Sequence, residues 1–285
     1  MKSLVFAITG ANGQIGSYFV DYLRKKGNVV YELVRSPDKA KDKQYYRYFD
    51  LSELSAIPVL NDIDVLIHTA HYFDTTDQNY RKINVIGTKA LFEKAKKNQV
   101  NFSIFISSIS TFSNAQSLYG RTKYEIEECI KDENVIIVRP GLVLNQPLKG
   151  IAGAMDRFIQ KSRFLPLIGN GRQQIYICFL NELTHLIFIL SLSKPVVNNP
   201  IIAATEKGIS FKQLLKYFAS QQQKKIMFLP VPFYMAFFTL KVLEWLKLFS
   251  GLRSDSLLGL QFVNKEIDFS ETKNRGFTFS GLNIE

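Results

Sequence analysis

The chain has 285 residues, of which 46% are hydrophobic and 21% charged, a balance that excludes intrinsic disorder and allows a substantial buried core. The 36 Lys and Arg residues against 25 Asp and Glu residues give a formal net charge of +11. This excess predicts an acidic partner, such as a nucleotide, a phosphorylated substrate or an anionic surface. Because the basic residues are scattered in short clusters, we do not expect a nucleic-acid site.

The first half of the chain alternates short apolar segments with longer amphipathic ones. Strands are predicted at 4–9, 29–34, 45–49, 64–69, 102–107 and 135–139, with helices at 14–26, 78–97 and 118–131. Alternation of this kind favours a parallel sheet with right-handed crossovers and helices on both faces. We therefore predict a doubly wound α/β domain, the Rossmann arrangement, over residues 1–145.

The second half has a less regular pattern after Arg139-Pro140-Gly141. Helices are predicted at 151–162, 180–192, 210–223 and 232–249, separated by short extended segments. No flexible linker divides the halves. Residues 146–285 are therefore expected to form a smaller, mostly helical substrate lobe over the carboxyl edge of the sheet, and part of this stretch can return to the Rossmann sheet.

The segment FYMAFFTLKVLEWLKLF, residues 233–249, is strongly apolar. Lys241, Glu244 and Lys247 interrupt it in three-residue steps, which keeps them near one face and indicates an amphipathic helix rather than a spanning one. Packing on the protein's own core is favoured, and docking on a membrane surface or a partner stays open as the alternative.

The cysteines and the N-terminus bear on location. Cys129 and Cys178 are far apart and lack CxxC spacing, so neither a disulfide framework nor a zinc site is indicated, and no metal is expected. The N-terminal MKSLVFAITG has too short an apolar run for a signal peptide and leads into a glycine motif. A reduced cytoplasmic setting is expected.

A glycine motif, TGANGQIG, follows the first predicted strand directly and opens a helix. Gly10, Gly13 and Gly16 allow a tight turn and a close backbone approach to a pyrophosphate. The helix begins at Gln14 and Ile15, and its free N–H groups and dipole stabilise the phosphate charge. Because a strand precedes the motif and a helix follows it, we predict a dinucleotide-binding loop.

The end of the second strand indicates which dinucleotide is preferred. An acidic residue there suits the ribose of NAD, whereas an arginine accommodates the 2′-phosphate of NADP. The strand VVYELVR ends in Val34 and Arg35, and Glu32 lies too early, on the face of Val30 and Val34. NADP(H) is therefore favoured, with Arg35 on the phosphate, and NAD(H) stays open.

Further motifs follow in order along the chain. They are Asp50-Leu51, HTAH at 68–71, Asn84 with Gly87-Thr88, SSISTFS at 107–113, YGRTK at 119–123 and RPG at 139–141. Together with the glycine loop they resemble the extended short-chain dehydrogenase/reductases, in the NAD-dependent epimerase/dehydratase family. The second half resembles the family more loosely, through GNG at 169–171, FLNEL at 179–183 and DFSETKNRGF at 268–277.

The resemblance implies a catalytic set of Ser108, Tyr119 and Lys123. Tyr119 would be the acid/base of hydride transfer, and Lys123, one turn on, would favour its phenolate and hold the nicotinamide ribose. Ser108 would bond the substrate oxygen, although Ser107 and Ser110 compete for this role. The resemblance also implies cofactor contacts from Asp50, Leu51, Thr69, Ala70 and Pro140, besides Tyr119 and Lys123. Packing or hydrogen-bonding roles are expected for His68 and His71, and a structural role for Asn84.

The resemblance further implies a nucleotide-linked sugar as substrate, with Arg172 and Arg253 as candidate phosphate contacts. Arg35 favours an NADPH-dependent keto-sugar reductase, and an NAD-dependent nucleotide-sugar 4-epimerase is the alternative. A dehydratase is disfavoured because Ile109 and Ser110 supply no acid after Ser108. Two other classes stay open: a non-catalytic NADP(H)-binding sensor or assembly protein, and a membrane-proximal sterol or lipid dehydrogenase. A homodimer through helices 78–97 and 118–131 is expected by analogy with the fold.

Overall fold

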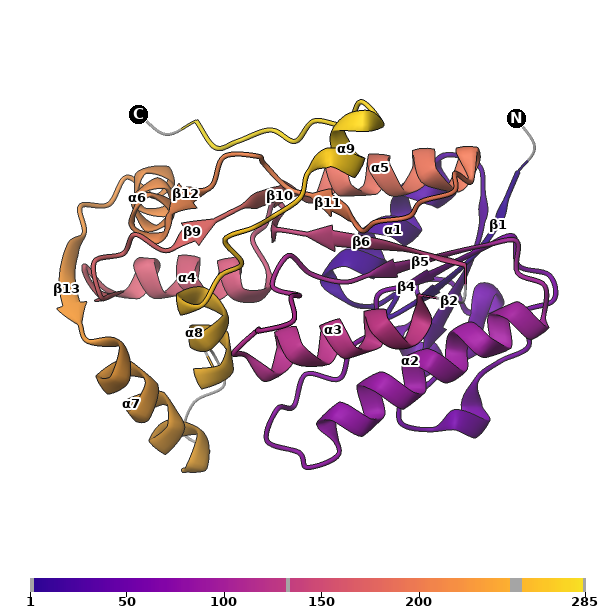
Figure 1. The fold of residues 1–285 in the computed structure, drawn as a ribbon, viewed down its shortest axis with the longest axis horizontal. Coiled ribbons are helices and arrows are strands. Elements are labelled where there is room, and N and C mark those ends of the chain that lie inside the picture. The colour runs from indigo at the N-terminus through magenta and orange to yellow at the C-terminus, as the bar shows by residue number, and fades with distance from the viewer. Residues whose placement is uncertain (1–2, 132–133, 247–252, 284–285) are drawn as a thin grey trace.

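A computed structural model of the chain describes residues 3–131, 134–246 and 253–283. Its centre is a seven-stranded parallel sheet in the order β11-β6-β5-β4-β1-β2-β3 (Figure 1). The strands are β1 (Val5–Thr9), β2 (Val29–Val34), β3 (Tyr46–Tyr48), β4 (Val65–His68), β5 (Phe102–Ile106), β6 (Val135–Pro140) and β11 (Ile201–Ala203). The strand order reverses between β1 and β4, which pair side by side, and a ligand crevice is expected outside their carboxyl ends.

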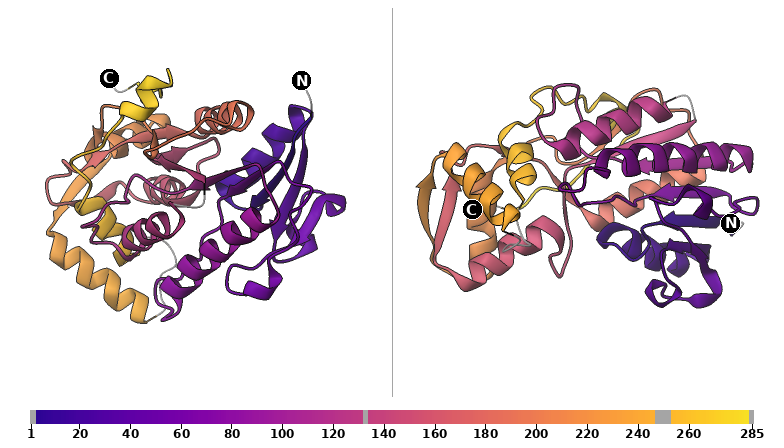
Figure 2. Two further views of the ribbon diagram at one scale, coloured as in Figure 1. Left: turned by 45° about the vertical axis from the view of Figure 1, so that its right-hand side comes forward. Right: turned by 90° about the horizontal axis from the view of Figure 1, so that it is seen from below.

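Helices cover both faces of this sheet. Helices α1 (Gln14–Lys25) and α5 (Leu180–Ser193) lie on one face, and α2 (Tyr80–Lys97) and α3 (Leu118–Ile130) lie on the other (Figures 1 and 2). Strand β1 shows why both faces are buried: Phe6 and Ile8 join the core beneath α1, while Ala7 joins the core beneath α2. The predicted doubly wound α/β class is confirmed.

The predicted elements of the first half are all present, with their ends moved by one or two residues. The largest relative change is in the third strand, predicted at 45–49, because residues 43–45 form a 3₁₀ turn and only 46–48 pair with β2. Helix α1 ends before Gly27, whose φ of +80° is a left-handed conformation that favours glycine.

The second half of the chain contributes to two bodies. Strand β11 pairs with β6 at the edge of the Rossmann sheet, and α5 packs against α1. The remaining elements form the C-terminal lobe around a third core cluster. They are β7 (Leu142–Leu144), α4 (Gly150–Lys161), β8 (Phe164–Ile168), β9 (Gln174–Ile175), β10 (Ile177–Phe179), β12 (Ile209–Ser210), α6 (Phe211–Gln221), β13 (Met227–Val231), α7 (Phe233–Trp245) and α8 (Ser254–Gln261), whereas α9 (Ser270–Asn274) packs on β11.

The helices predicted in the second half match α4, α5 and α6 closely, while α7 covers residues 233–245 of the predicted helix 232–249. Residues 247–249 of that prediction lie outside the described residues. Within the described ranges, no helix combines the length and the apolar character needed to cross a membrane.

Candidate active site

The glycine motif forms a tight turn between β1 and α1. Gly10 has a φ of +63°, and a Cβ added there would lie 2.9 Å from the hydroxyl of Thr69. A Cβ at Gly16 would lie 2.3 Å from the carbonyl oxygen of Gly10, so the first turn of α1 packs directly on the loop. Gly13 is the N-cap residue of α1, and no side chain caps this end of the helix. The N-terminus of α1 therefore offers backbone N–H groups to an anion, at the crevice between β1 and β4.

The loop after β4 is fastened to the end of β1. Thr9 Oγ1 accepts hydrogen bonds from the amides of Thr69 and Ala70 at 3.1 and 3.2 Å, and the Thr69 hydroxyl donates to the Thr9 carbonyl at 2.7 Å. His68 lies between the Thr9 and Thr88 hydroxyls, at 2.6 and 3.0 Å, and burial holds its pKa well below the usual value. A neutral, hydrogen-bonded His68 fits the packing role expected for it.

Arg35 is exposed immediately after β2, at the same edge of the sheet. Glu32 is fully buried: it pairs with Arg24 at 2.9 Å and accepts hydrogen bonds from the amides of Lys41 and Asp42. These internal partners hold the Glu32 carboxylate beneath α1, so it does not face the crevice. Arg35 is thus the charged side chain at the end of β2.

Asp50, Leu51 and Pro140 lie in the loops and strand ends around the sheet. The Asp50 carboxylate accepts hydrogen bonds from the amide and hydroxyl of Ser52, and Leu51 is buried against Gly87 of α2. Pro140 is buried at the end of β6, where its carbonyl accepts a hydrogen bond from Ile109 at 2.9 Å. That hydrogen bond fixes the start of the serine-rich loop after β5, residues 107–113.

Tyr119 sits in the first turn of α3 within an aromatic cluster. Its ring meets His71 edge-on, with centroids 5.0 Å apart, and stacks on Phe73 at 6.4 Å. His71 Nε2 lies 2.7 Å from the Tyr80 hydroxyl, and burial followed by the charge of Lys123 holds the pKa of His71 well below its usual value. The sequence assigned His71 packing and hydrogen bonding, and the structure adds direct contact with Tyr119.

Ser108 is the serine that interacts with Tyr119. Burial raises the pKa of Tyr119 to about 12, and the side-chain hydrogen bond with Ser108 partly offsets that rise. The other two candidates differ: the Ser107 hydroxyl lies 3.2 Å from Thr111 Oγ1 in the core, and Ser110 donates its amide to Ser108 Oγ. The phenol is therefore the stable form of Tyr119 near neutral pH.

Lys123 follows Tyr119 by one helical turn and is almost fully buried. Its Nζ donates to the carbonyl of Ile106 at 2.9 Å and lies 4.4 Å from the Phe105 ring centroid. Burial lowers the pKa of Lys123 to about 7, against the opposing charge of Glu127.

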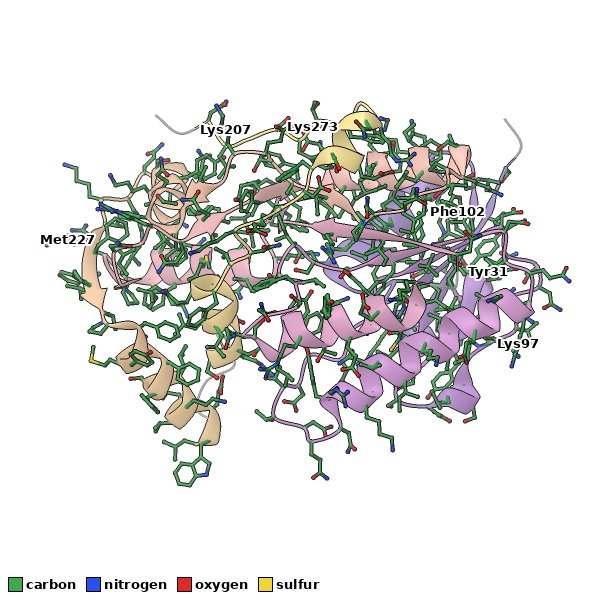
Figure 3. All side chains as sticks on the ribbon, in the orientation of Figure 1. Tyr31, Lys97, Phe102, Lys207, Met227 and Lys273 are labelled. Atoms are coloured by element: carbon green, nitrogen blue, oxygen red, sulfur yellow. The ribbon has the colours of Figure 1, made fainter. Side chains whose placement is uncertain are left out.

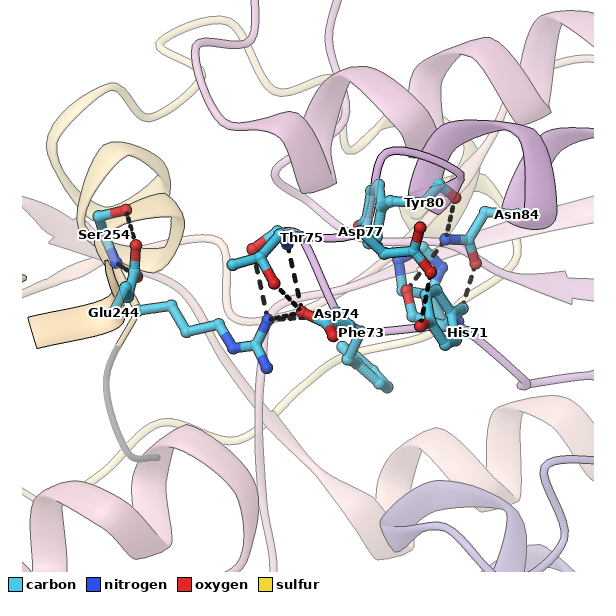
Figure 4. Close-up of polar contacts among 12 residues, drawn as sticks. His71, Phe73, Asp74, Thr75, Asp77, Tyr80, Asn84, Glu244 and Ser254 are labelled. Carbon is cyan, nitrogen blue, oxygen red and sulfur yellow. Dashed lines mark hydrogen bonds and ion pairs between the residues drawn. The ribbon is translucent and has the colours of Figure 1, made fainter. Parts of the chain in front are cut away.

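Two polar residues hold the framework of this site. Asn84, fully buried in α2, accepts from the amide of Tyr72 at 2.9 Å and donates to the carbonyls of Tyr72 and Tyr80, which anchors the loop after β4 (Figure 4). Asp255 of α8 accepts hydrogen bonds from the amides of Leu118 and Tyr119 at 2.6 and 3.1 Å. The sequence offered no signal for Asp255, since its partners lie in a different part of the chain.

The two candidate phosphate-binding arginines have different surroundings. Arg172 is exposed in the turn between β8 and β9, where its amide donates to Asn170 Oδ1 at 3.0 Å. Arg253 Nη1 donates to the carbonyl of Phe73 at 2.9 Å and pairs with Asp74 at 3.3 Å. Arg253 therefore joins the lobe to the loop after β4.

The arrangement supplies an anion-binding helix terminus, an adjacent tyrosine in its phenol form, a serine hydroxyl beside it and a buried lysine one turn away. Such a set can exchange a proton with a substrate oxygen in a partly dehydrated site. Among the residues that the structure describes, no group of three His, Cys, Asp or Glu side chains could hold a metal ion. The fold is of the doubly wound α/β class.

Residues 6–144 match the family model described as "NAD dependent epimerase/dehydratase family". Over this stretch the chain is similar to the members of that family. A curated relative, cinnamoyl-CoA reductase 1 of Petunia hybrida, is 31% identical over an alignment of 117 residues that covers 37% of this chain and 35% of that protein. The chain thus spans about a third of that relative's length.

Solved structures share the fold across most of the chain. The UDP-glucose 4-epimerase of Thermotoga maritima, solved with UDP-glucose, gives a TM-score of 0.69 at 16% identity and covers 80% of this chain and 86% of its own. The dTDP-4-dehydrorhamnose reductase of Bacillus anthracis str. Ames, in complex with NADP, gives 0.67 at 18% identity and covers 90% and 98%. At these identities the likeness shows the fold.

Proposed function

We propose that this protein is an NAD(P)-dependent oxidoreductase that acts on a nucleotide-linked sugar by hydride transfer, with Tyr119 as the acid/base. The observation that carries the proposal is the contact of Tyr119, which Ser108 hydrogen-bonds, with His71 in the loop that is bonded to the end of β1 just before the glycine turn. When bound, the nicotinamide dinucleotide would supply or accept the hydride.

The residues around the crevice fit such a dinucleotide. A Cβ at Gly10 would meet Thr69 and a Cβ at Gly16 would meet the Gly10 carbonyl, so glycine at these positions allows the tight turn that a pyrophosphate-binding loop needs. The residues proposed to hold the cofactor are Gly10, Gly13, Gln14, Ile15, Gly16, Arg35, Asp50, Leu51, Thr69, Ala70, Pro140, Tyr119 and Lys123. Arg35 supports NADP(H), because an exposed guanidinium suits a 2′-phosphate while the buried Glu32 is not free to bond a ribose.

The chain's own residues account for the proton. A Tyr119 phenol with a pKa of about 12 carries its proton at neutral pH and can give it to a substrate oxygen during reduction. The resulting phenolate needs stabilisation, and the Ser108 hydroxyl supports it because that hydrogen bond lowers the pKa. Lys123 in its protonated form would favour the phenolate further, from one turn along the same face of α3.

A nucleotide sugar is supported as substrate by the names of the structural neighbours and by the charge of the chain. UDP-glucose and dTDP-4-dehydrorhamnose are named for the two neighbours above. The net charge of +11 favours a diphosphate ligand, and Arg172 is exposed for such a contact. Arg253 could take part if it exchanged its bond to Asp74 for one to a phosphate.

The favoured reaction is NADPH-dependent reduction of a keto-sugar nucleotide, and the alternative is an NAD-dependent 4-epimerase. Both use the same tyrosine, so Arg35 is the observation that favours the reductase. A sensor or assembly protein would bind NADP(H) without needing Tyr119 and its partners, so their retention favours an enzyme.

Replacement of Tyr119 by Phe tests the proposal. We expect turnover of keto-sugar nucleotides with NADPH to be lost while NADPH affinity is kept, and Tyr124→Phe on the same helix serves as the matched control. Equal turnover of the Tyr119→Phe variant would overturn the catalytic role. Mass spectrometry of dinucleotide released on denaturation separates the alternatives, since stoichiometric NAD would favour the epimerase.

A further inference from the structure

Helix α7 is apolar but contains no buried residue. Its exposed apolar side chains are Tyr234 at 72%, Met235 at 57%, Phe238 at 64%, Val242 at 53% and Trp245 at 80%. These positions recur at three- and four-residue steps, so they share one face of the helix. An apolar helix face of this size, left open to water, marks an interaction surface.

The opposite side of α7 is fastened to the lobe. Phe233 packs edge-on against Phe262, with ring centroids 5.7 Å apart, and Glu244 accepts hydrogen bonds from the amide and hydroxyl of Ser254 at 2.6 and 2.8 Å (Figure 4). Because these contacts fix the rotation of the helix, its apolar face is held outward. The sequence favoured packing of this segment on the protein's own core, whereas the helix in the structure rests on α8 through one side.

Strands β8 and β13 extend the same surface. They pair in parallel with Met227 beside Phe164 and Leu229 beside Pro166. Met227 is 61% exposed, Phe164 53% and Leu229 49%. Met227 lies at the outer edge of the molecule, at the start of β13, and the other end of this strand leads into α7 (Figures 1 and 3). The outer face of this strand pair and the outer face of α7 together are called the apolar edge below.

Basic residues accompany the apolar edge. Arg163 and Lys225 stand exposed at the starts of the two strands, and Lys241 is exposed on α7. The segments 163–168 and 225–231 contain no acidic residue, and the one acid of α7 is Glu244, which is turned toward Ser254. The edge therefore combines aromatic and aliphatic side chains with positive charge.

We propose that the apolar edge docks the protein on the surface of a membrane that contains anionic phospholipid. Aromatic residues such as Trp245 and Tyr234 suit the boundary between headgroups and acyl chains, and lysines and arginines beside them attract anionic headgroups. A second copy of the chain fits less well, because a two-fold contact through this edge brings the same cations together without acids to pair them. The proposal concerns a surface separate from the crevice and does not rest on the proposed function.

Trp245 is the sole tryptophan of the chain, and its high exposure makes its fluorescence a direct probe of docking. The experiment titrates the full chain with vesicles of phosphatidylcholine mixed with phosphatidylserine, and with vesicles of pure phosphatidylcholine. We expect a blue shift of Trp245 emission and co-sedimentation with the mixed vesicles, both weakened by salt.

Variants localise the effect. Phe238→Ser should weaken partition by about tenfold or more, since it removes a large apolar side chain from the lipid contact. Val196→Ser, at a residue 88% exposed in the loop before β11, is the matched control and should change little. Lys225→Glu should weaken binding to the mixed vesicles by about tenfold. Lys97→Glu makes the same charge change at the opposite end of the molecule and should not (Figure 3).

Two results would overturn the proposal. An emission shift that follows protein concentration without vesicles, together with a dimeric mass in solution, would assign the edge to a second copy. Unchanged Trp245 emission and no co-sedimentation with mixed vesicles would exclude docking on a membrane. Tyr119→Phe should bind vesicles as the original chain does, so failure of the proposed chemistry and failure of docking are seen separately.

Discussion

The carboxylate of Asp255 caps the helix that carries Tyr119, with Oδ2 3.1 Å from the Tyr119 amide and Oδ1 2.6 Å from the amide of Leu118. These hydrogen bonds join the C-terminal lobe to α3 across 136 positions of sequence. The negative charge lies at the positive end of the helix dipole and satisfies N–H groups that have no partner within the helix. The lobe thereby fixes the position of Tyr119 beside the crevice.

Removal of this cap should loosen the first turn of α3. We expect Asp255→Ala to lower the free energy of unfolding by about 1–2 kcal/mol, as loss of an N-terminal cap does. The kcat of the proposed reaction should fall while dinucleotide affinity changes little. Asp255→Asn keeps one acceptor and should lose less. Asp268→Ala removes a similar turn-capping carboxylate at α9, and an equal loss of kcat in that control would contradict the link to Tyr119.

The identity of the catalytic serine can be tested among three neighbours. Ser108→Ala should lower kcat by about 10²–10³-fold, because a hydroxyl that stabilises developing negative charge is lost. The same variant should raise the pKa of Tyr119, since Ser108 lowers it. Ser110→Ala is the matched control and should retain activity. Steady-state kinetics over a pH series would decide, and full activity of Ser108→Ala would exclude its role.

The lowered pKa of the buried Lys123 makes the stability of the folded protein depend on pH. This pKa is about 7 in the folded protein and near 10.5 when unfolded, so between these values the unfolded chain binds more protons. The cost of burying the ammonium is full below pH 7 and disappears as the pH rises toward 10. Thermal unfolding should therefore show Tm rising across this window, and Lys123→Met should flatten the rise. An unchanged slope in Lys123→Met would contradict a buried, titrating lysine.

The proposed contact of Arg35 with the 2′-phosphate predicts a preference for NADP(H) over NAD(H). A charge-assisted hydrogen bond contributes roughly 1.5–3 kcal/mol, so Arg35→Ser should weaken NADPH binding by about tenfold to a hundredfold and leave NADH binding nearly unchanged. Lys26→Ser, after the far end of α1, is the control for loss of one positive charge. Isothermal titration with both cofactors measures the ratio. If Arg35→Ser weakened the binding of NADPH and NADH equally, a contact between Arg35 and the 2′-phosphate would be excluded.

The Rossmann half could be predicted because its signals are local. The turn at Gly10 needs a left-handed φ, and glycine adopts it without strain, so the motif is readable from a few neighbouring residues. The face of Glu32 could be predicted for the same reason, since side chains alternate along a strand and the structure buries this residue beneath α1. The glycine loop and the alternation of strands and helices around it follow from such patterns.

The aromatic surroundings of Tyr119 could be predicted only in part. The HTAH stretch drew attention to His71, yet its contact with the Tyr119 ring depends on how the loop after β4 packs against the first turn of α3. Asn84 fixes that loop through both of its amide atoms, and the sequence indicated its structural role without its partners. Spacing along one helix could not supply these distances.

The sequence by itself determined the doubly wound class, the glycine loop, the placement of Tyr119 and Lys123 on one helical face, and the location of the apolar segment at 233–249. Only the tertiary structure decided that β11 returns to the sheet, that Asp255 caps α3 and that α7 turns its apolar face outward. The physical reason is the range of the interactions. Backbone conformation and side-chain periodicity act between near neighbours, whereas caps, strand pairing and burial depend on chain segments that meet only after folding.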